Sequence, residues 1–105
     1  MSRHRFKLMC RYITFDDLGE RTSRQAEDPK LYKISQVFNA FNENIQSAYK
    51  PSKQLCIDET LYPFRGRSNL VQYMKSKPTR YGLKYYNICD VKNSYLLKSI
   101  FYKGK

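Results

Sequence analysis

Pro51 constrains this chain more than any other residue, because the spacing of apolar side chains changes there. Before it, apolar residues recur at steps of three and four, which is the period of an amphipathic helix. Proline cannot continue a helix, so the chain must turn at residues 50–52. After the turn, residues 53–59 alternate between the two faces of a strand. We expect the apolar face of the helix to be core: Leu31, Ile34, Val37, Phe38, Phe41, Ile45, Ala48 and Tyr49.

Two helices are predicted before this turn. Ser2 precedes apolar residues at helical spacing up to Ile13, and its side chain can accept a free N–H group of the first turn. The second helix is predicted to begin at Asp28-Pro29, because aspartate caps a helix and proline loses no hydrogen bond at the first helical position. Residues 16–28 are polar and lack a period, so we expect an exposed loop there.

Three antiparallel strands are predicted after the turn, at residues 53–59, 83–89 and 95–102. The last two are joined by residues 91–94, which suit a hairpin turn with Asn93 in the left-handed conformation. The order of the elements predicts an α+β fold in which two N-terminal helices precede the three strands.

The segment between the first two strands, residues 61–81, is predicted to be mostly loop. Pro63, Gly66 and Pro78 interrupt any regular structure in it, and one extended segment is expected at residues 70–74. The loop is rich in Lys, Arg and Tyr, which is the composition of a surface that meets a polyanion.

Positive charge is concentrated in the second half of the chain. Residues 61–105 contain ten Lys and Arg against one acid, a net charge of +9, whereas the first sixty contain ten against eight, a net charge of +2. A surface with this bias attracts nucleic acid through counterion release, without reading a base sequence. The alternative is a basic solvated surface with no polyanionic partner.

The apolar runs and the cysteines indicate in which compartment the protein works. No apolar run approaches the roughly 18 residues needed to cross a bilayer, and the N-terminus lacks the apolar centre of a signal peptide. We therefore expect a soluble, intracellular protein without a membrane partner. Cys10, Cys56 and Cys89 are far apart in sequence and form no Cys-x-x-Cys motif, and His4 is the one imidazole. These spacings predict neither a disulfide framework nor a zinc site, so we interpret the cysteines as small apolar residues in a reducing compartment.

Several short motifs follow one another at close spacing. The most specific are Ile57-Asp58-Glu59, Phe64-Arg65-Gly66-Arg67 and Lys77-Pro78-Thr79-Arg80-Tyr81-Gly82, and the others are Asn42-Glu43-Asn44, Tyr49-Lys50-Pro51-Ser52, Gln72-Tyr73-Met74, Cys89-Asp90 and Tyr102-Lys103-Gly104. Together they resemble the piggyBac transposases and the domesticated proteins derived from them. The resemblance covers nearly the whole chain.

The resemblance implies a cut-and-paste DNA transposase with an RNase H-like catalytic core, in which three aspartates hold two divalent metal ions such as Mg²⁺. Asp58 matches the first of these aspartates, so it is the implied catalytic and metal-binding residue. The candidate phosphate contacts in the adjoining basic segment are Arg65, Arg67, Lys75, Lys77, Arg80 and Lys84. The implied organisation is a helical lead-in over residues 1–50 and a truncated RNase H-like core over residues 51–105.

In the resembling transposases the other two catalytic aspartates lie beyond the point that matches Lys105. We therefore expect a fragment with an incomplete RNase H-like fold that is not active alone. Asp90 matches an aspartate outside the catalytic three, and Glu59 faces away from Asp58 on the strand, so neither completes the site. The alternative is that Asp58 is an exposed acid at the strand end with no role.

Two classes of function stay open. The first is a transposase-derived DNA-binding remnant, nuclear like its relatives, whose nonspecific affinity falls with salt. The second is an exapted interaction module that binds an intact transposase, or another copy of itself, through the open edge of the first strand. Tyr73, Tyr81, Tyr85 and Tyr86 either stack on unpaired bases or pack in the core.

Overall fold

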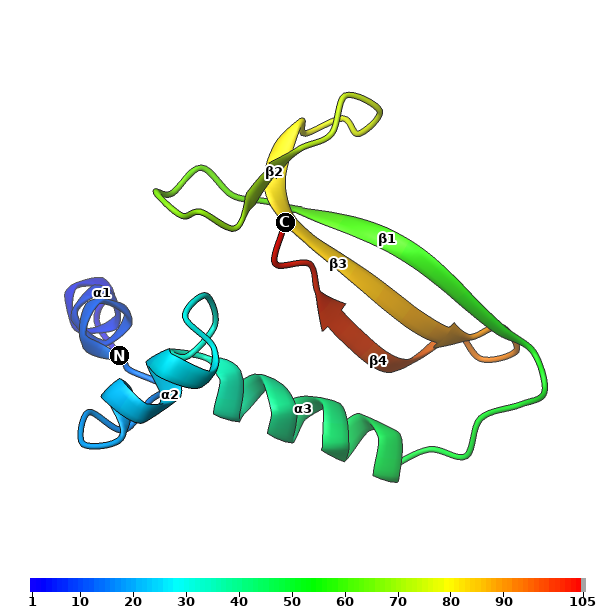
Figure 1. Ribbon diagram of the computed structural model, residues 1–105, viewed down its shortest axis with the longest axis horizontal. Helices are drawn as coiled ribbons and strands as arrows, with labels where there is room; N and C mark the ends of the chain where they lie inside the picture. Colours follow the sequence, from blue (N-terminus) through cyan, green and yellow to red (C-terminus); the bar gives the residue numbers. More distant parts are fainter. Residues whose placement is uncertain (105) are drawn as a thin grey trace. The chain divides into compact units, whose positions relative to one another are not determined.

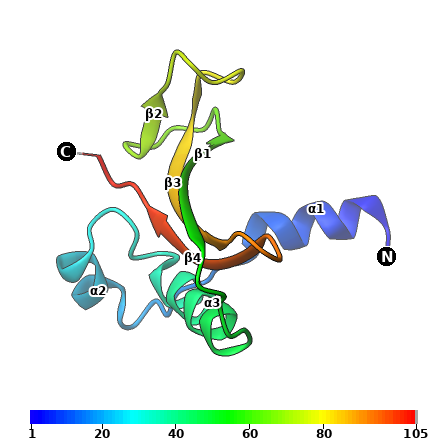
Figure 2. The same cartoon turned by 90° about the vertical axis from the view of Figure 1, so that its right-hand side faces the viewer.

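The computed structural model describes residues 1–104 and contains three helices and one antiparallel sheet of four strands (Figures 1 and 2). The elements are α1 (Arg3–Tyr12), α2 (Arg21–Glu27), α3 (Ser35–Ser47), β1 (Leu55–Pro63), β2 (Val71–Tyr73), β3 (Tyr81–Asp90) and β4 (Tyr95–Phe101). The predicted α+β class is confirmed, with one more helix and one more strand than expected. The chain falls into two compact units, Met1–Phe38 and Asn39–Lys105, and each is described by itself.

The first unit begins with the predicted capped helix. The Oγ atom of Ser2 accepts a hydrogen bond from the backbone N–H of Arg5 at 3.3 Å, and α1 ends at Tyr12. No residue of α1 is buried, although its spacing is amphipathic. The period therefore identified the helix but did not decide whether its apolar face is covered.

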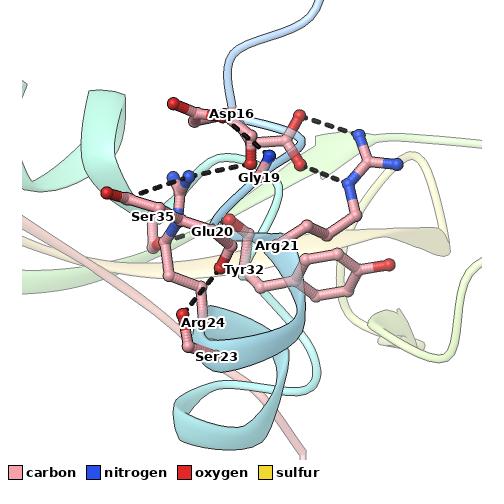
Figure 3. Close-up of polar contacts among 9 residues, drawn as sticks. Asp16, Gly19, Glu20, Arg21, Ser23, Arg24, Tyr32 and Ser35 are labelled. Carbon is pink, nitrogen blue, oxygen red and sulfur yellow. Dashed lines mark hydrogen bonds and ion pairs between the residues drawn. The ribbon is translucent and has the colours of Figure 1, made fainter.

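The polar segment at residues 16–28 is not the continuous loop that we expected, because α2 occupies its second half. Arg21, the first residue of α2, donates two hydrogen bonds to the carboxylate of Asp16, at 2.7 Å and 3.0 Å (Figure 3). These bonds fix the start of the helix. Arg24 adds an ion pair to Glu20 at 3.5 Å, one helical turn away. Polar side-chain contacts of this kind stabilise a short helix without any apolar period, so a periodicity argument misses it.

The long helix starts later than predicted. The Oδ1 atom of Asp28 accepts hydrogen bonds from the N–H groups of Lys30 and Leu31, as a capping aspartate does. Residues 29–34 nevertheless form turns, and α3 begins at Ser35.

The apolar stripe of this helix was expected to be core, and for most of its length that prediction is wrong. Val37 and Phe41 are 49% and 45% exposed. Spacing shows which face of a helix is apolar, but burial also needs a facing surface, and the described residues cover little of the stripe. Among residues 1–104, the buried apolar side chains are Leu31, Leu70, Leu97 and Phe101.

The sheet of the second unit is built around β3. One edge of β3 pairs with β1 along its whole length. The other edge pairs with β2 near the start of β3 and with β4 over the rest. The expected extended segment at residues 70–74 therefore becomes the short strand β2, and β1 continues to Pro63 instead of ending at Glu59.

Gly82 makes the close approach of β3 to β1 possible. A Cβ atom at this position would lie 2.2 Å from the carbonyl oxygen of Tyr62, closer than real Cβ contacts allow. Gly82 is paired with Pro63 on one side and Gln72 on the other, so three strands meet at a residue without a side chain.

The hairpin between β3 and β4 forms at residues 91–94 as predicted, but its left-handed residue is Ser94, with φ 52°, instead of Asn93. The reason lies in Asp90, whose Oδ1 atom accepts hydrogen bonds from the N–H groups of Lys92 at 2.8 Å and Asn93 at 3.2 Å. These two bonds hold the first part of the turn in place, and the reversal of φ falls one residue later.

Candidate metal and nucleic-acid site

Asp58 lies within β1, three residues from its start, and not at the end of a strand as the sequence suggested. Strand alternation and the register place it on the same sheet face as Cys56 and Thr60, directly opposite Asn87 of β3. The side chain is exposed, and its Oδ1 atom accepts a hydrogen bond from the N–H group of Glu59 at 2.8 Å. The carboxylate is therefore presented to solvent from the middle of a regular, paired strand.

A chain of hydrogen bonds crosses the sheet beside Asp58 and joins the side chains of Thr60, Asn87 and Ser99. Asn87 donates from Nδ2 to Thr60 Oγ1 at 3.0 Å and accepts at Oδ1 from Ser99 Oγ at 2.8 Å. The N–H group of Ser99 donates to Oδ1 of Asn42 in α3 at 2.8 Å. Both ends of the Asn87 amide are thus engaged, which fixes the side chain that faces Asp58 across the ladder.

Sequence reasoning did not predict this chain of hydrogen bonds. Asn42 and Ser99 are both buried, and a buried polar side chain needs a hydrogen-bond partner. The available signal was the presence of the uncharged polar residues Asn87 and Ser99 within strands that are mostly apolar or aromatic. That signal marks polar positions, but it does not show that they lie opposite each other.

Glu59 and Lys84 lie on the other face of the sheet. Nζ of Lys84 is 2.8 Å from Oε2 of Glu59 and lies 4.9 Å and 5.1 Å from the ring centroids of Tyr86 and Tyr102. The hydrogen bond to Glu59, followed by one to Tyr86, raises the pKa of Lys84 above its ordinary value. The structure therefore places this candidate phosphate contact in an internal ion pair, away from the Asp58 face.

Lys77 also has an internal partner, because its Nζ donates to the backbone carbonyl of Glu59 at 3.0 Å. The other four candidate phosphate contacts are exposed, and they lie in the two loops that flank β2: Arg65, Arg67, Lys75 and Arg80. The structure thus leaves four of the six predicted cations exposed on the two loops, whereas Lys77 and Lys84 contact Glu59 of β1.

An open pocket of about 550 Å³ lies at the base of the first of these loops. It is lined by Phe64, Arg65, Gly66, Arg67, Ser68, Val71 and Tyr81. A Cβ atom on Gly66 would lie 2.4 Å from the ring of Phe64, so the glycine leaves room for that ring. Two cations and two aromatic rings therefore line one concave surface, which suits a phosphate with an adjoining planar group.

The four tyrosines that were candidates for base stacking divide between surface and interior: Tyr73, Tyr81, Tyr85 and Tyr86. Tyr73 and Tyr81 are 53% and 57% exposed, and their ring centroids are 5.0 Å apart. Tyr85 packs on Phe101 at 4.5 Å, and burial raises the pKa of its phenol. Tyr86 meets Tyr102 edge to face. Of these four tyrosines, Tyr73 and Tyr81 are thus the exposed pair.

Asp90, the one acid among residues 61–104, has a structural role. Its side chain is fully buried, and it accepts backbone N–H bonds from Ser52 before β1 as well as from the turn after β3. The bond from Ser52 is the largest cause of the lowered pKa of Asp90. Asp90 therefore joins the entry of β1 to the β3–β4 turn.

Within residues 1–104, no three or more His, Cys, Asp and Glu side chains lie together in a group that could hold a metal ion. In the same residues no helix is long and apolar enough to cross a membrane. Asp58 is thus a single exposed carboxylate next to a fixed amide.

The sheet thus presents one exposed aspartate in β1, and exposed cations lie on the two loops around β2. A family model described as Transposase IS4 matches residues 1–105, so the chain belongs to that family. Among solved structures, it is similar to the piggyBac transposase in a cryo-EM synaptic complex with hairpin DNA, with a TM-score of 0.92 and 31% sequence identity. The match covers all of this chain and 22% of that one. The resemblance to piggyBac transposases is confirmed, and the α+β arrangement is the first part of an RNase H-like fold.

Proposed function

We propose that this chain supplies the first metal-binding aspartate and part of the DNA-binding surface of a piggyBac-type transposase domain. The observation that carries the proposal is Asp58, exposed at the centre of β1, in a chain that matches a DNA-bound transposase along all 105 of its own residues. The substrate class is duplex DNA, and the chemistry is phosphodiester cleavage and strand transfer.

The family implies a divalent metal, and Asp58 fits one ligand position for Mg²⁺. Mg²⁺ in proteins is often held by one or two carboxylates, with water and phosphate oxygens completing six ligands. When bound, such ions activate the attacking oxygen and stabilise the leaving oxygen. Asn87 cannot turn toward the ion without breaking its bonds to Thr60 and Ser99, so its role is to hold the surface beside Asp58.

A two-metal site needs several carboxylates around ions about 4 Å apart. On the Asp58 face of the sheet, the described residues offer Asp58 alone, since Glu59 pairs with Lys84 on the other face. We infer that Asp58 works with carboxylates from further polypeptide, and that residues 1–104 by themselves bind DNA without cutting it.

The DNA contacts are assigned to the four exposed cations of the loops around β2, namely Arg65, Arg67, Lys75 and Arg80. Cations that are already paired gain less from a phosphate, because the existing bond must be broken first. Lys84 and Lys77 are therefore weaker contacts than their neighbours.

Acting on chromosomal DNA would place the protein in the nucleus, which imaging of a tagged chain would test.

The experiment is duplex-DNA binding by the purified chain at two salt concentrations, with and without Mg²⁺. We expect binding that falls with salt, and no strand cleavage. The double variant Arg65→Ala/Arg67→Ala should reduce the salt slope by about two, because each lost phosphate contact lowers it by about one.

Lys98→Ala is the matched control, because Lys98 is an exposed lysine of β4 outside the basic loops. It removes one positive charge but should leave the salt slope unchanged. An equal loss of affinity per charge in both variants would show that net charge, and not the loop surface, attracts DNA. Mg²⁺-dependent cleavage that Asp58→Ala abolishes would contradict the inference that these residues do not cut alone.

A second candidate function rests on the edge of β1. Among the described residues this strand pairs with β3 alone, and Ile57 beside that edge is 72% exposed. An unpaired edge with an apolar neighbour can accept a strand from another copy or from an intact transposase. Concentration-dependent size in gel filtration, abolished by Ile57→Lys and insensitive to salt, would support this function over DNA binding.

A further inference from the structure

Cys56 and Cys89, which are 33 positions apart in sequence, are direct partners in the β1–β3 ladder. Residues directly opposite each other in antiparallel strands have Cα atoms about 4.5–5.5 Å apart, which lies within the range of about 4.4–6.8 Å that a disulfide requires. The two side chains lie on the same face of the sheet, because directly opposed residues of a ladder share a face. Both cysteines are free in this structure. The sequence spacing, which predicted unrelated apolar cysteines, gave no sign of this pairing.

Two further features favour reaction between these thiols. Cys56 is exposed and therefore open to a reagent, whereas Cys89 is only half-buried behind it. On the other side of β3, the ladder to β4 changes register between Ile88 and Cys89. A ladder is looser at such an irregularity, so the backbone at Cys89 can make the small shift that a sulfur–sulfur bond needs.

We propose that Cys56 and Cys89 form a redox-active dithiol site, which a low-molecular-weight disulfide such as oxidised glutathione converts into a cross-strand disulfide beside Asp58. The proposal does not depend on the transposase function. It assigns a modification site to the face that presents Asp58, since Cys56 lies two residues before Asp58 on the same side of β1.

The reaction proceeds by two exchanges. The sulfur of Cys56 attacks one sulfur of oxidised glutathione, which forms a mixed disulfide, releases one glutathione as the leaving thiolate and frees the proton of Cys56 to protonate it. The sulfur of Cys89 then attacks the sulfur of Cys56 and releases the second glutathione, which takes the proton of Cys89. The two cysteines lose two electrons and two protons, and one oxidised glutathione becomes two reduced molecules.

The new bond would join β1 to β3 next to Asp58. Cross-strand links between directly opposed residues require Cβ atoms closer than an ordinary ladder provides, and a disulfide under such strain is more easily reduced. Reduced glutathione should therefore reopen it, so that the site responds to the thiol–disulfide balance around it.

The test exposes the folded wild-type chain to oxidised glutathione, stops the reaction by alkylation, and measures intact mass and non-reduced peptides. We expect a product that has lost two hydrogens, with the peptide of Cys56 linked to that of Cys89. Because the second exchange is intramolecular, the mixed disulfide at Cys56 should stay below about a tenth of the oxidised chain. A product that carries one or more glutathiones with no internal link would overturn the proposal, as would a link to Cys10.

Three single variants, each checked for folding by circular dichroism, separate the pair from the third cysteine. Cys10→Ser is the control, because Cys10 lies on α1 with an exposed side chain, and this variant should close the disulfide as the wild type does. Cys56→Ser and Cys89→Ser should stop at a mixed disulfide. In denaturant, the wild-type chain should form links to Cys10 as well as the link between Cys56 and Cys89. If the Cys56–Cys89 link still predominates there, the fold does not create the site.

Discussion

The two acids at the centre of β1 are neighbours in sequence and have opposite surroundings. Asp58 is exposed on the face that carries Asn87, and its Oδ1 atom accepts a hydrogen bond from the N–H group of Glu59. Glu59 lies on the other face, where it pairs with Lys84. The comparison teaches that a motif fixes which residues are present, while the sheet decides which of them is available to a ligand.

The largest effect should come from breaking the register that separates the two acids. Gly82→Val places a side chain against the carbonyl oxygen of Tyr62, so the β1–β3 ladder must open. We expect a loss of about 3 kcal/mol or more in the free energy of unfolding, measured by urea denaturation. Gly19→Ala is the control, because its Cβ atom would meet only the flexible side chain of Asp17 at 3.3 Å. A Gly82 variant as stable as the control would mean that the strands do not approach this closely.

The next effect concerns Asp90, which ties β1 to the β3–β4 turn. Its pKa is lowered in the folded state, so the stability that it contributes is present above the unfolded value of about 3.9 and is lost as the pH falls through the folded value. Asp90→Ala leaves three backbone N–H groups without this acceptor and should lower Tm by about 5 °C or more at pH 7.

The pH dependence of melting checks this prediction. Below about pH 4 the difference in Tm between wild type and Asp90→Ala should narrow, because the wild-type carboxylate becomes protonated. The pKa of Asp16 is also lowered, by its bond to Arg21, so Asp16→Asn serves as the control for acid sensitivity that arises elsewhere. A constant difference in Tm across pH would mean that the charge of Asp90 is unimportant.

A smaller effect sharpens the comparison directly. The raised pKa of Lys84 depends first on Glu59, so Glu59→Gln should return it toward 10.5, as measured by NMR titration of the lysine side chain. Because the pKa is raised on folding, this pair stabilises the protein below the unfolded pKa, and the effect disappears as the pH rises through the folded value. Asp58→Asn should leave the pKa of Lys84 unchanged. A shift in that variant would place the two acids in one electrostatic site and end the distinction between the faces.

The smallest expected effect on stability is that of Asp58→Asn. Substitution of an exposed side chain with no ion pair should change the free energy of unfolding by less than about 0.5 kcal/mol. Metal binding should respond instead. Mn²⁺ should broaden the NMR signals of β1 around Asp58 in the wild type and in Glu59→Gln, and not in Asp58→Asn. Broadening that survives in Asp58→Asn would place the metal elsewhere.

Several local features were predictable because they depend on neighbours in sequence. The cap at Ser2, the turn before β1, the hairpin at residues 91–94 and the extended segment near Leu70 all follow from the chemistry of a few adjacent residues. The family was also evident in the sequence, because motifs such as Ile57-Asp58-Glu59 and Phe64-Arg65-Gly66-Arg67 are short and contiguous.

Partners across the sheet were not predictable in this way. The sequence could place Cys56 and Asp58 on one face of β1, but only the register sets them opposite Cys89 and Asn87. The same is true of the bond from Ser99 to Asn42, which spans 57 positions, and of the pairing that occupies Lys84. The sequence therefore offered six candidate phosphate contacts, and the fold leaves four of them exposed on the loops.

The sequence by itself determined the class of fold, the family and the residue types of the site, because local spacing and contiguous motifs carry that information. Only the tertiary structure decided which acid faces solvent, which cations stay exposed and which cysteines lie opposite each other. Those outcomes depend on strand register, and a shift of one residue would exchange the two faces of β1.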